Sequence, residues 1–336
     1  MKLVKFSKSY KDVLRLQEDY SKQNALNLKI VTKINNKYSK EKKRTNCQNC
    51  QNKITKPFIE NFGIKYSICN KCGHLNGFYK NTEKFINWVY NSDVGDHYNE
   101  EYAKLFEKKV KNIYLPKVEF LKKVIKQKIN LIDIGSGAGH FVKALEFKKI
   151  SAVGYEVSDF LVSQGNSQLK KNRIKKVKTS DLYKILENEN QANVLSLIGV
   201  LEHFSKPNEF FKSFIKSKIK YLYLTVPLFS LTTFLESAFK NVYPRHLSGD
   251  HTHLYTQKSL EYLSKKYNLK IIGEWWFGSD MPDLFRSLFV SSKKLDNKVF
   301  TDSINKNLYS VIDDLQNVLD RNKICSEVHM IFKKQK

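Results

Sequence analysis

Long hydrophobic runs are missing from this chain of 336 residues. Its most apolar stretch, Tyr221 to Leu235, is interrupted by polar residues and a proline, whereas a membrane-spanning helix needs about 18–20 consecutive apolar residues. The lysine-rich start of the chain is not followed by the apolar segment of a secretion signal. We therefore expect a soluble, cytoplasmic protein without a membrane span.

Arginine is scarce although the chain is strongly basic. Only six of its 59 basic residues are arginine, and 33 acidic residues leave a net charge of +26. Arginine is the side chain favoured for bidentate recognition of phosphates and bases, and the lysines are spread along the whole chain. We interpret most of the charge as solvated surface, so nucleic acid is the less favoured partner. An anionic small-molecule substrate is equally consistent with it.

Cysteine is also scarce, and four of the five cysteines fall into two closely spaced pairs. Cys47 and Cys50 form one pair, and after an 18-residue gap Cys69 and Cys72 form the other, followed by Gly73. Two such pairs can present four thiolates to one tetrahedral ion, whereas disulfides are disfavoured in a reducing cytoplasm. The spacing predicts a structural Zn²⁺ with a closed coordination sphere, which stabilises the fold and takes no part in catalysis.

Composition and periodicity divide the chain into four parts. We expect an N-terminal helical extension over 1–44, a zinc-ribbon-like module over 45–81, a helical connector or lid over 82–128 and a large domain over 129–336. In the last part, short apolar runs alternate with amphipathic segments. That alternation predicts an α/β fold with a doubly wound parallel sheet.

The first strand of the large domain runs into a glycine-rich loop. Gly135, Gly137 and Gly139 form a Gly-x-Gly-x-Gly pattern just before an expected helix. Alone, this pattern fits a dinucleotide-binding loop or a simple tight turn. The next strand, however, ends in Glu156, a carboxylate placed at the carboxyl edge of the sheet to accept hydrogen bonds from a ribose diol. The two features together indicate a cofactor that carries a ribose.

With these residues the sequence resembles the class I S-adenosylmethionine-dependent methyltransferases. The segment Asp133–Gly139 is similar to their first motif, and Ser180–Leu182 to the segment that recognises the adenine amino group. Asn193–Phe204 is similar to the fourth-strand segment of ubiquinone-type and sugar methyltransferases, although many relatives have Asp in place of Asn193. The resemblance implies a Rossmann-like, seven-stranded sheet with an antiparallel last strand, and S-adenosylmethionine as cofactor. The cofactor-binding residues that we expect are Asp133, Gly135, Ser136, Gly137, Gly139, Glu156, Asp181 and Glu202.

A histidine-rich segment follows the fifth expected strand. His246, His251 and His253 fall within eight residues, together with Asp250. Such a segment fits an active-site loop, a histidine-rich surface loop or a second metal site. Methyl transfer is an in-line displacement that needs aligned reactants and, for some acceptors, removal of a proton. The candidate catalytic residues are His253 as the base, with His251, Asp250 and His203.

The cysteine pairs, the glycine loop and the histidine segment together resemble the zinc-containing methyltransferases of nucleotide-sugar and polysaccharide pathways. This implies a nucleotide-linked or polysaccharide sugar as the acceptor. Members that methylate carbon have a glutamate where this chain has Thr252, so O-, N- and C-methylation all stay open. The resemblance also implies a lid beside the donor pocket at Asp96–Tyr102, for which a solvated helix start is the alternative.

Other hypotheses remain. An RNA methyltransferase would also combine a zinc ribbon with a basic surface, but the fourth strand lacks the Asn/Asp-Pro-Pro-aromatic turn of enzymes that methylate base amines. A zinc-stabilised scaffold that binds S-adenosylmethionine without catalysis is disfavoured by the intact cofactor motifs. Glu202 and His203 equally fit a helix start that positions its loop without touching substrate.

Overall fold

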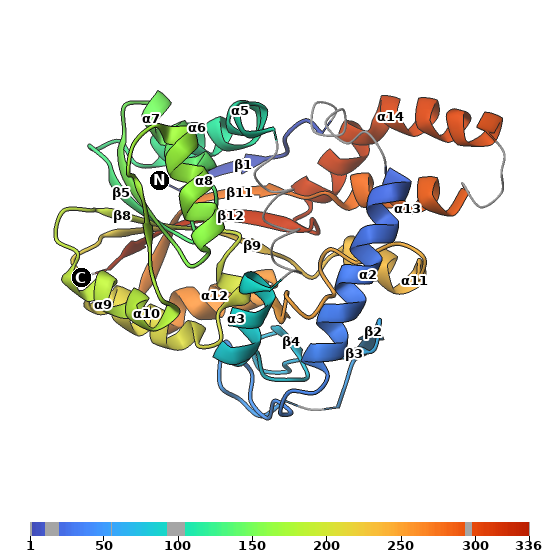
Figure 1. Cartoon of the computed structure of the whole chain (residues 1–336), viewed down its shortest axis with the longest axis horizontal. Coiled ribbons are helices and arrows are strands. Elements are labelled where there is room, and N and C mark those ends of the chain that lie inside the picture. Colours follow the sequence, from blue (N-terminus) through green and yellow to red (C-terminus); the bar gives the residue numbers. More distant parts are fainter. Residues whose placement is uncertain (1, 11–19, 55, 93–104, 293–297, 336) are drawn as a thin grey trace.

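The computed structural model describes residues 2–10, 20–54, 56–92, 105–292 and 298–335. Its largest element is an eight-stranded sheet in the order β1-β11-β12-β9-β8-β5-β6-β7 (Figure 1). The bounds are β1 Leu3–Phe6, β5 Asn130–Ile134, β6 Ser151–Glu156, β7 Ile174–Lys176, β8 Val194–Ile198, β9 Tyr221–Pro227, β11 Leu269–Phe277 and β12 Glu327–Lys334. Neighbouring strands are parallel except at β12, which is antiparallel to both β9 and β11. The predicted Rossmann-like α/β fold with an antiparallel last strand is confirmed.

The central strands separate two apolar cores. Ile132 and Ile134 of β5 pack in one core and Leu131 in the other, because successive side chains of a strand point to opposite faces of the sheet. Helices cover both faces. Those of the large domain are α7 His140–Phe147, α8 Asp159–Leu169, α9 Leu182–Asn188, α10 Pro207–Lys216, α11 Leu231–Ala238, α12 Gln257–Lys266, α13 Asp280–Ser292 and α14 Lys298–Arg321. None of the helices in the described ranges is both long and apolar enough to cross a membrane.

The N-terminal part corrects one expectation. Residues 3–6 form β1, which pairs in parallel with β11, and not a helix; the sheet therefore has eight strands and not seven. The Lys5 ammonium lies 3.5 Å from the centre of a Trp275 ring, and the Trp275 indole N–H donates to the Ser7 carbonyl. These partners are far away in the sequence, so a four-residue run could not reveal them. Farther along, α2 at Tyr20–Tyr38 is helical as expected.

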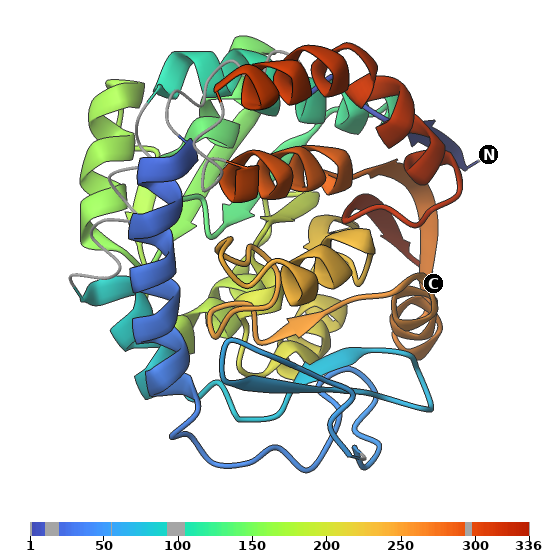
Figure 2. The same cartoon turned by 90° about the vertical axis from the view of Figure 1, so that its right-hand side faces the viewer.

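A second, four-stranded sheet lies mostly in the part of the chain that carries the cysteine pairs. Its order is β10-β4-β3-β2, with bounds β2 Ile59–Asn61, β3 Ile64–Ile68, β4 Leu75–Gly77 and β10 His253–Leu254. The cysteine pairs stand in the segments before β2 and between β3 and β4. Three strands come from the predicted zinc module, whereas β10 comes from the histidine-rich segment and pairs antiparallel with β4. The small sheet lies beside α2 (Figure 2), and Tyr38 of that helix packs with Tyr66 and Leu75 of the sheet.

The connector between the two sheets is helical where it is described. Its elements are α3 Glu83–Asn91, α5 Phe106–Lys109, the π-helix η1 Val110–Tyr114 and α6 Leu115–Val124. Thr82 caps α3 by accepting from the Phe85 backbone N–H, which is the usual role of threonine at this position. The proposed lid segment Asp96–Tyr102 lies outside the described residues.

Candidate functional site

The glycine-rich loop joins the end of β5 to the start of α7. Gly135, Gly137 and Gly139 have φ angles of 68°, 54° and 80°, a left-handed region that favours glycine over other residues. A Cβ atom at Gly135 would also come within 2.5 Å of the Val200 side chain. Gly135 and Gly137 line a cavity of about 580 Å³, a size in the usual range for small-ligand sites. Gly135 and Gly137 thus present backbone atoms without side chains to the cavity.

Glu156 stands at the end of β6, in the same cavity wall. Its Oε2 accepts a hydrogen bond from the Gly137 N–H at 2.8 Å, and its Oε1 accepts from the N–H groups of Val157 and Ser158. Burial raises the pKa of this carboxyl, and the backbone N–H donors oppose that rise. Each carboxylate oxygen has two acceptor sites, so Oε2 keeps one for a ligand. The hydrogen bond from the Gly137 N–H therefore connects Glu156, the residue expected to bind the ribose, to the glycine-rich loop.

Asp133 lies behind the loop and not in the cavity wall. It is 2% exposed, and its Oδ1 accepts a hydrogen bond of 2.6 Å from the Ser196 hydroxyl. Burial raises the pKa of its carboxyl to about 7. Asp133 therefore links β5 to β8 behind the glycine-rich loop. Ser136, Gly139 and Asp181 are also absent from the described cavity wall, although Thr179 and Leu182 on either side of Asp181 belong to it.

A polar cluster forms another part of the wall. Glu202 and His203 come from the 3-10 turn η3 (Leu201–His203) after β8, and Asp250 and His251 come from the histidine-rich segment. His203 Nδ1 lies 2.9 Å from the Asp250 carbonyl, the rings of His203 and His251 are 4.9 Å apart, and Glu202 Oε1 lies 4.0 Å from His203 Nε2. The expected catalytic residues His203, Asp250 and His251 are thus brought together, and Glu202 lies with them.

Burial controls the charge of this cluster. Glu202 is 3% exposed, and burial raises the pKa of its carboxyl to about 8. Burial also lowers the pKa of His203 to about 4 and lowers the pKa of His251. The Asp250 carboxylate accepts a hydrogen bond from the Ser248 hydroxyl, and the neighbouring histidines help to lower its pKa against the effect of burial. At neutral pH the histidines present neutral rings, which can act as acceptors or ligands.

His253 is placed differently from the prediction. It is fully buried in β10, its Nδ1 lies 3.0 Å from His74 Nε2, and it is not part of the cavity wall. Among the described residues His253 does not line the cavity, so its role as the base stays a prediction. His251, two residues earlier, does line the cavity; it lies in a bend before β10, so the regular alternation of strand side chains does not relate the two rings.

The cavity wall also contains residues that the sequence motifs do not predict. Lys117 of α6 is 7% exposed, and Arg245 forms a salt bridge of 2.9 Å with Asp283. Both line the cavity, as does Glu327 at the start of β12. The sequence carries one weak signal for Lys117, a basic residue within the mostly buried face of a short amphipathic helix. Arg245 and Glu327 reach the cavity through tertiary packing alone.

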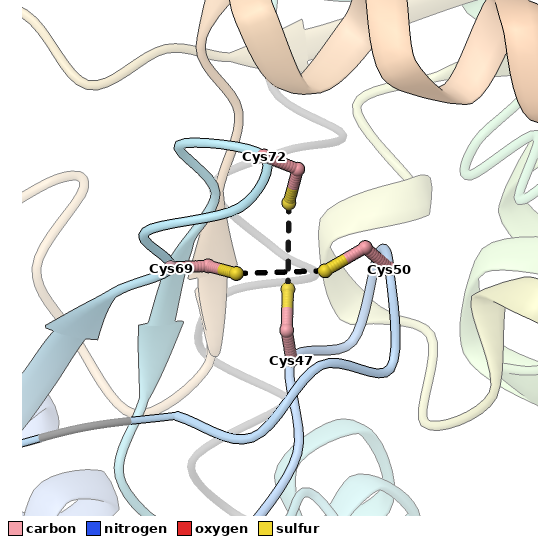
Figure 3. Close-up of side chains that lie close together, drawn as sticks. All are labelled: Cys47, Cys50, Cys69 and Cys72. Atoms are coloured by element: carbon pink, nitrogen blue, oxygen red, sulfur yellow. Dashed lines mark hydrogen bonds between the residues drawn. The ribbon is translucent and has the colours of Figure 1, made fainter.

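The four paired cysteines converge in the small module (Figure 3). Cys47 and Cys72 have their sulfurs 3.7 Å apart, Cys50 and Cys69 have theirs 3.4 Å apart, and all four sulfurs lie within 4.8 Å of one another. None of the four is in a disulfide. Sulfurs bound tetrahedrally to one ion at about 2.3 Å would be about 3.8 Å apart. The cluster is therefore compatible with a bound zinc ion.

Side chains around the cysteines supply hydrogen bonds to the sulfurs. The Asn76 amide donates to the Cys47 sulfur at 3.5 Å, and the Asn49 amide donates to the Cys72 sulfur at 3.7 Å. Such outer contacts stabilise thiolates and orient them. Asn76 also lies in β4 opposite His253 of β10. The cysteine cluster is thus directly connected to the histidine-rich segment.

The comparison with protein families agrees with this architecture. The sequence model of a family described as "Methyltransferase domain" matches residues 106–274. The fold is similar to magnesium protoporphyrin IX methyltransferase (ChlM) from Synechocystis PCC 6803 with bound SAH, at 9% identity over 76% of this chain and 100% of that one, with a TM-score of 0.48. It is also similar to a SAM dependent methyltransferase from Archaeoglobus fulgidus, at 17% identity, 69% and 100% coverage and a TM-score of 0.42.

A third similar structure is the methyltransferase domain of bacterial CtHen1, at 16% identity over 67% of this chain and 99% of that one, with a TM-score of 0.42. The search of curated proteins finds no match to this sequence.

Proposed function

The chain belongs to the methyltransferase-domain family, and from this premise we propose that it transfers a methyl group from S-adenosylmethionine to a nucleotide-linked or polysaccharide sugar. The observation that carries the proposal is a single cavity whose wall holds two different groups of residues. One is the glycine loop with Glu156, and the other is the polar cluster of Glu202, His203, Asp250 and His251. We assign the first to the donor and the second to the acceptor.

The donor end fits S-adenosylmethionine, whose sulfonium supplies an electrophilic methyl group. The backbone of Gly135 and Gly137 borders the cavity without side chains, which permits close approach of the methionine part. Glu156 Oε2 has an acceptor site left for a ribose hydroxyl. Apolar residues of the same wall, including Val157, Leu161 and Leu182, can enclose the adenine. In this proposal Asp181 does not line the described cavity itself. The turn that contains it places Thr179 and Leu182 in the cavity wall.

The acceptor end is polar and contains both acidic and basic side chains. His203 and Asp250 are fixed to each other through the ring and the backbone carbonyl, so they offer a prearranged set of groups for a hydroxyl or amine acceptor. Lys117 lines the cavity, as does Arg245 in its salt bridge with Asp283, and the Lys117 ammonium favours an acceptor with an anionic part such as a nucleotide diphosphate. This supports a nucleotide-linked sugar over a neutral one.

The cysteine module has a structural role in this proposal. Four thiolates would hold one Zn²⁺ with no open position. Strand β4 of that module pairs with β10, and the Gly77 N–H donates to the Thr252 carbonyl at 2.8 Å. Because Thr252 directly follows His251 in the sequence, zinc binding would keep the acceptor end in place from outside the cavity.

The test is transfer of label from methyl-labelled S-adenosylmethionine into two fractions of a cell extract, nucleotide-linked small molecules and total RNA. The expected result is label in the nucleotide-linked fraction that depends on the protein. Label in RNA alone would replace the sugar with the RNA hypothesis. Binding of S-adenosylhomocysteine without transfer into either fraction or into the polysaccharide of the extract would favour a non-catalytic scaffold.

A further inference from the structure

Three potential metal ligands meet in the cavity wall. One oxygen of Glu202 and one ring nitrogen each of His203 and His251 all lie within 4.8 Å of one another. Ligands at about 2.1 Å from one ion are at most about 4.2 Å apart, so small side-chain rotations would complete the set. The group is separate from the four cysteines and is made of nitrogen and oxygen atoms, not sulfur.

Two buried atoms of this group lack a hydrogen-bond partner among the described residues. These atoms are Glu202 Oε2 and His251 Nδ1, and Glu202 is 3% exposed while lining the cavity. A buried carboxyl oxygen without a partner costs free energy, because it has lost its hydration and gained no hydrogen bond in return. Because Glu202 lines the cavity, its oxygen, unpartnered in the part of the chain that the structure describes, indicates a ligand that binds at this wall.

The histidines are oriented as metal ligands usually are. A carbonyl oxygen only accepts, so the ring nitrogen of His203 beside the Asp250 carbonyl, Nδ1, carries the proton. The neutral ring then has its lone pair on Nε2, on the side of Glu202. The ring of His251 offers Nδ1, which has no hydrogen-bond partner among the described residues. A second ring nitrogen held by a backbone carbonyl is the common arrangement around metal sites.

We propose that Glu202, His203 and His251 bind one divalent first-row transition-metal ion in the wall of the cavity. Two neutral imidazoles and one carboxylate suit Zn²⁺, Fe²⁺, Co²⁺ or Mn²⁺. Three protein ligands leave coordination positions open toward the cavity, where oxygen atoms of the acceptor can bind. The role of the ion in holding the acceptor rests on the proposed function, whereas binding of the ion itself does not.

The test uses the full chain with the four-cysteine site kept filled with zinc. Co²⁺ is the probe, because its affinity for such sites lies between those of Mn²⁺ and Zn²⁺, and its visible absorption differs between sulfur and nitrogen or oxygen ligands. We expect one further equivalent of Co²⁺ to bind, with weak visible bands and no sulfur charge-transfer band. Glu202→Gln and His251→Ala should each weaken this binding by at least about tenfold.

A matched control is His246→Ala. His246 lines the same cavity but is not one of the three clustered ligands, so its variant should bind Co²⁺ like the wild type. Zinc per chain and affinity for S-adenosylhomocysteine, measured in every variant, report correct folding. No Co²⁺ beyond the cysteine site, or equal affinity in all variants, would overturn the proposal. Co²⁺ binding without methyl transfer would refute only the proposed function, and transfer without Co²⁺ binding only the metal site.

Discussion

His74 and His253 share a buried hydrogen bond of 3.0 Å that connects the cysteine module to the histidine-rich segment. His74 follows Cys72 by two residues, and His253 follows His251 by two. One end of this contact therefore lies beside the four-cysteine cluster and the other beside the cavity wall. The two regions that resemble separate motifs in the sequence form one continuous unit in the fold.

This contact predicts that His253→Ala is a stability variant. Loss of a fully buried side chain and of the His74 hydrogen bond should lower the free energy of unfolding by about 1–3 kcal/mol. Urea unfolding of the variant measures that loss. Affinity for S-adenosylhomocysteine should stay at the wild-type value under conditions where the variant is folded. Unchanged stability together with lost turnover would return His253 to the role of base.

His203→Ala should have the opposite effect. His203 lines the cavity and is part of the acceptor cluster, so we expect kcat to fall by roughly 10²-fold or more with little change in affinity for S-adenosylhomocysteine. Steady-state kinetics and calorimetry on the same preparation separate the two quantities. A wild-type kcat would exclude His203 from the reaction.

The donor end can be tested at Gly137. Gly137→Arg should abolish binding of S-adenosylhomocysteine, because the residue lines the cavity and has a φ of 54°, so a long side chain would fill the space. Zinc per chain should be unchanged. Gly63→Arg is the matched control, since Gly63 also has a positive φ of 77° but has open space around it. If the control variant also loses binding, the loss reflects misfolding and does not support the assignment of Gly137 to the donor pocket.

The pKa of Asp133 predicts a pH-dependent contribution to stability. Burial raises this pKa from 3.8 to about 7, so the folded state holds the proton more tightly than the unfolded state. The stabilisation is complete below 3.8 and is lost as the pH rises through about 7. Asp133→Asn keeps an acceptor for Ser196 and removes the titration.

The difference in unfolding free energy between Asp133→Asn and wild type should therefore shift in favour of the variant between about pH 5 and about pH 8. Urea unfolding at both pH values measures this shift. A difference that stays constant over this range would show that Asp133 does not titrate there.

Zinc binding is tested by Cys69→Ser against Cys325→Ser. Cys69 is one of the four clustered cysteines, whereas Cys325 is buried alone beside the Glu327 carbonyl. We expect Cys69→Ser to lose zinc and to lower Tm by about 5 °C or more, and Cys325→Ser to keep its zinc. Metal analysis and thermal unfolding measure both effects. Retention of one zinc per chain in Cys69→Ser would contradict the four-cysteine site.

The features that the sequence predicts well are local ones. The β5 loop is recognisable because Gly135, Gly137 and Gly139 occupy positions that need positive φ angles, and Glu156 because it ends an apolar strand. The cysteine pairs are recognisable because a thiolate site needs close spacing within each pair. In each case, neighbouring residues of the chain determine the geometry.

Other features depend on contacts between distant segments. Strand β1 exists because the edge of β11 is available to residues 3–6, and the sequence near those residues does not show this. The different positions of His251 and His253 also depend on the tertiary structure, because pairing of β10 with β4 buries His253, whereas His251 lies in the preceding bend and lines the cavity. Lys117 and Arg245 reach the cavity from separate helices and loops for the same reason.

The most direct measurement of the two-ended cavity is a crystal structure of the full chain with S-adenosylhomocysteine. We predict that the ribose hydroxyls lie within hydrogen-bond distance of Glu156 and that the amino-acid part lies against Gly135 and Gly137. We also predict that the sulfur points toward His203 and His251. A ligand bound elsewhere, or one whose sulfur faces away from those histidines, would contradict the assignment of donor and acceptor ends.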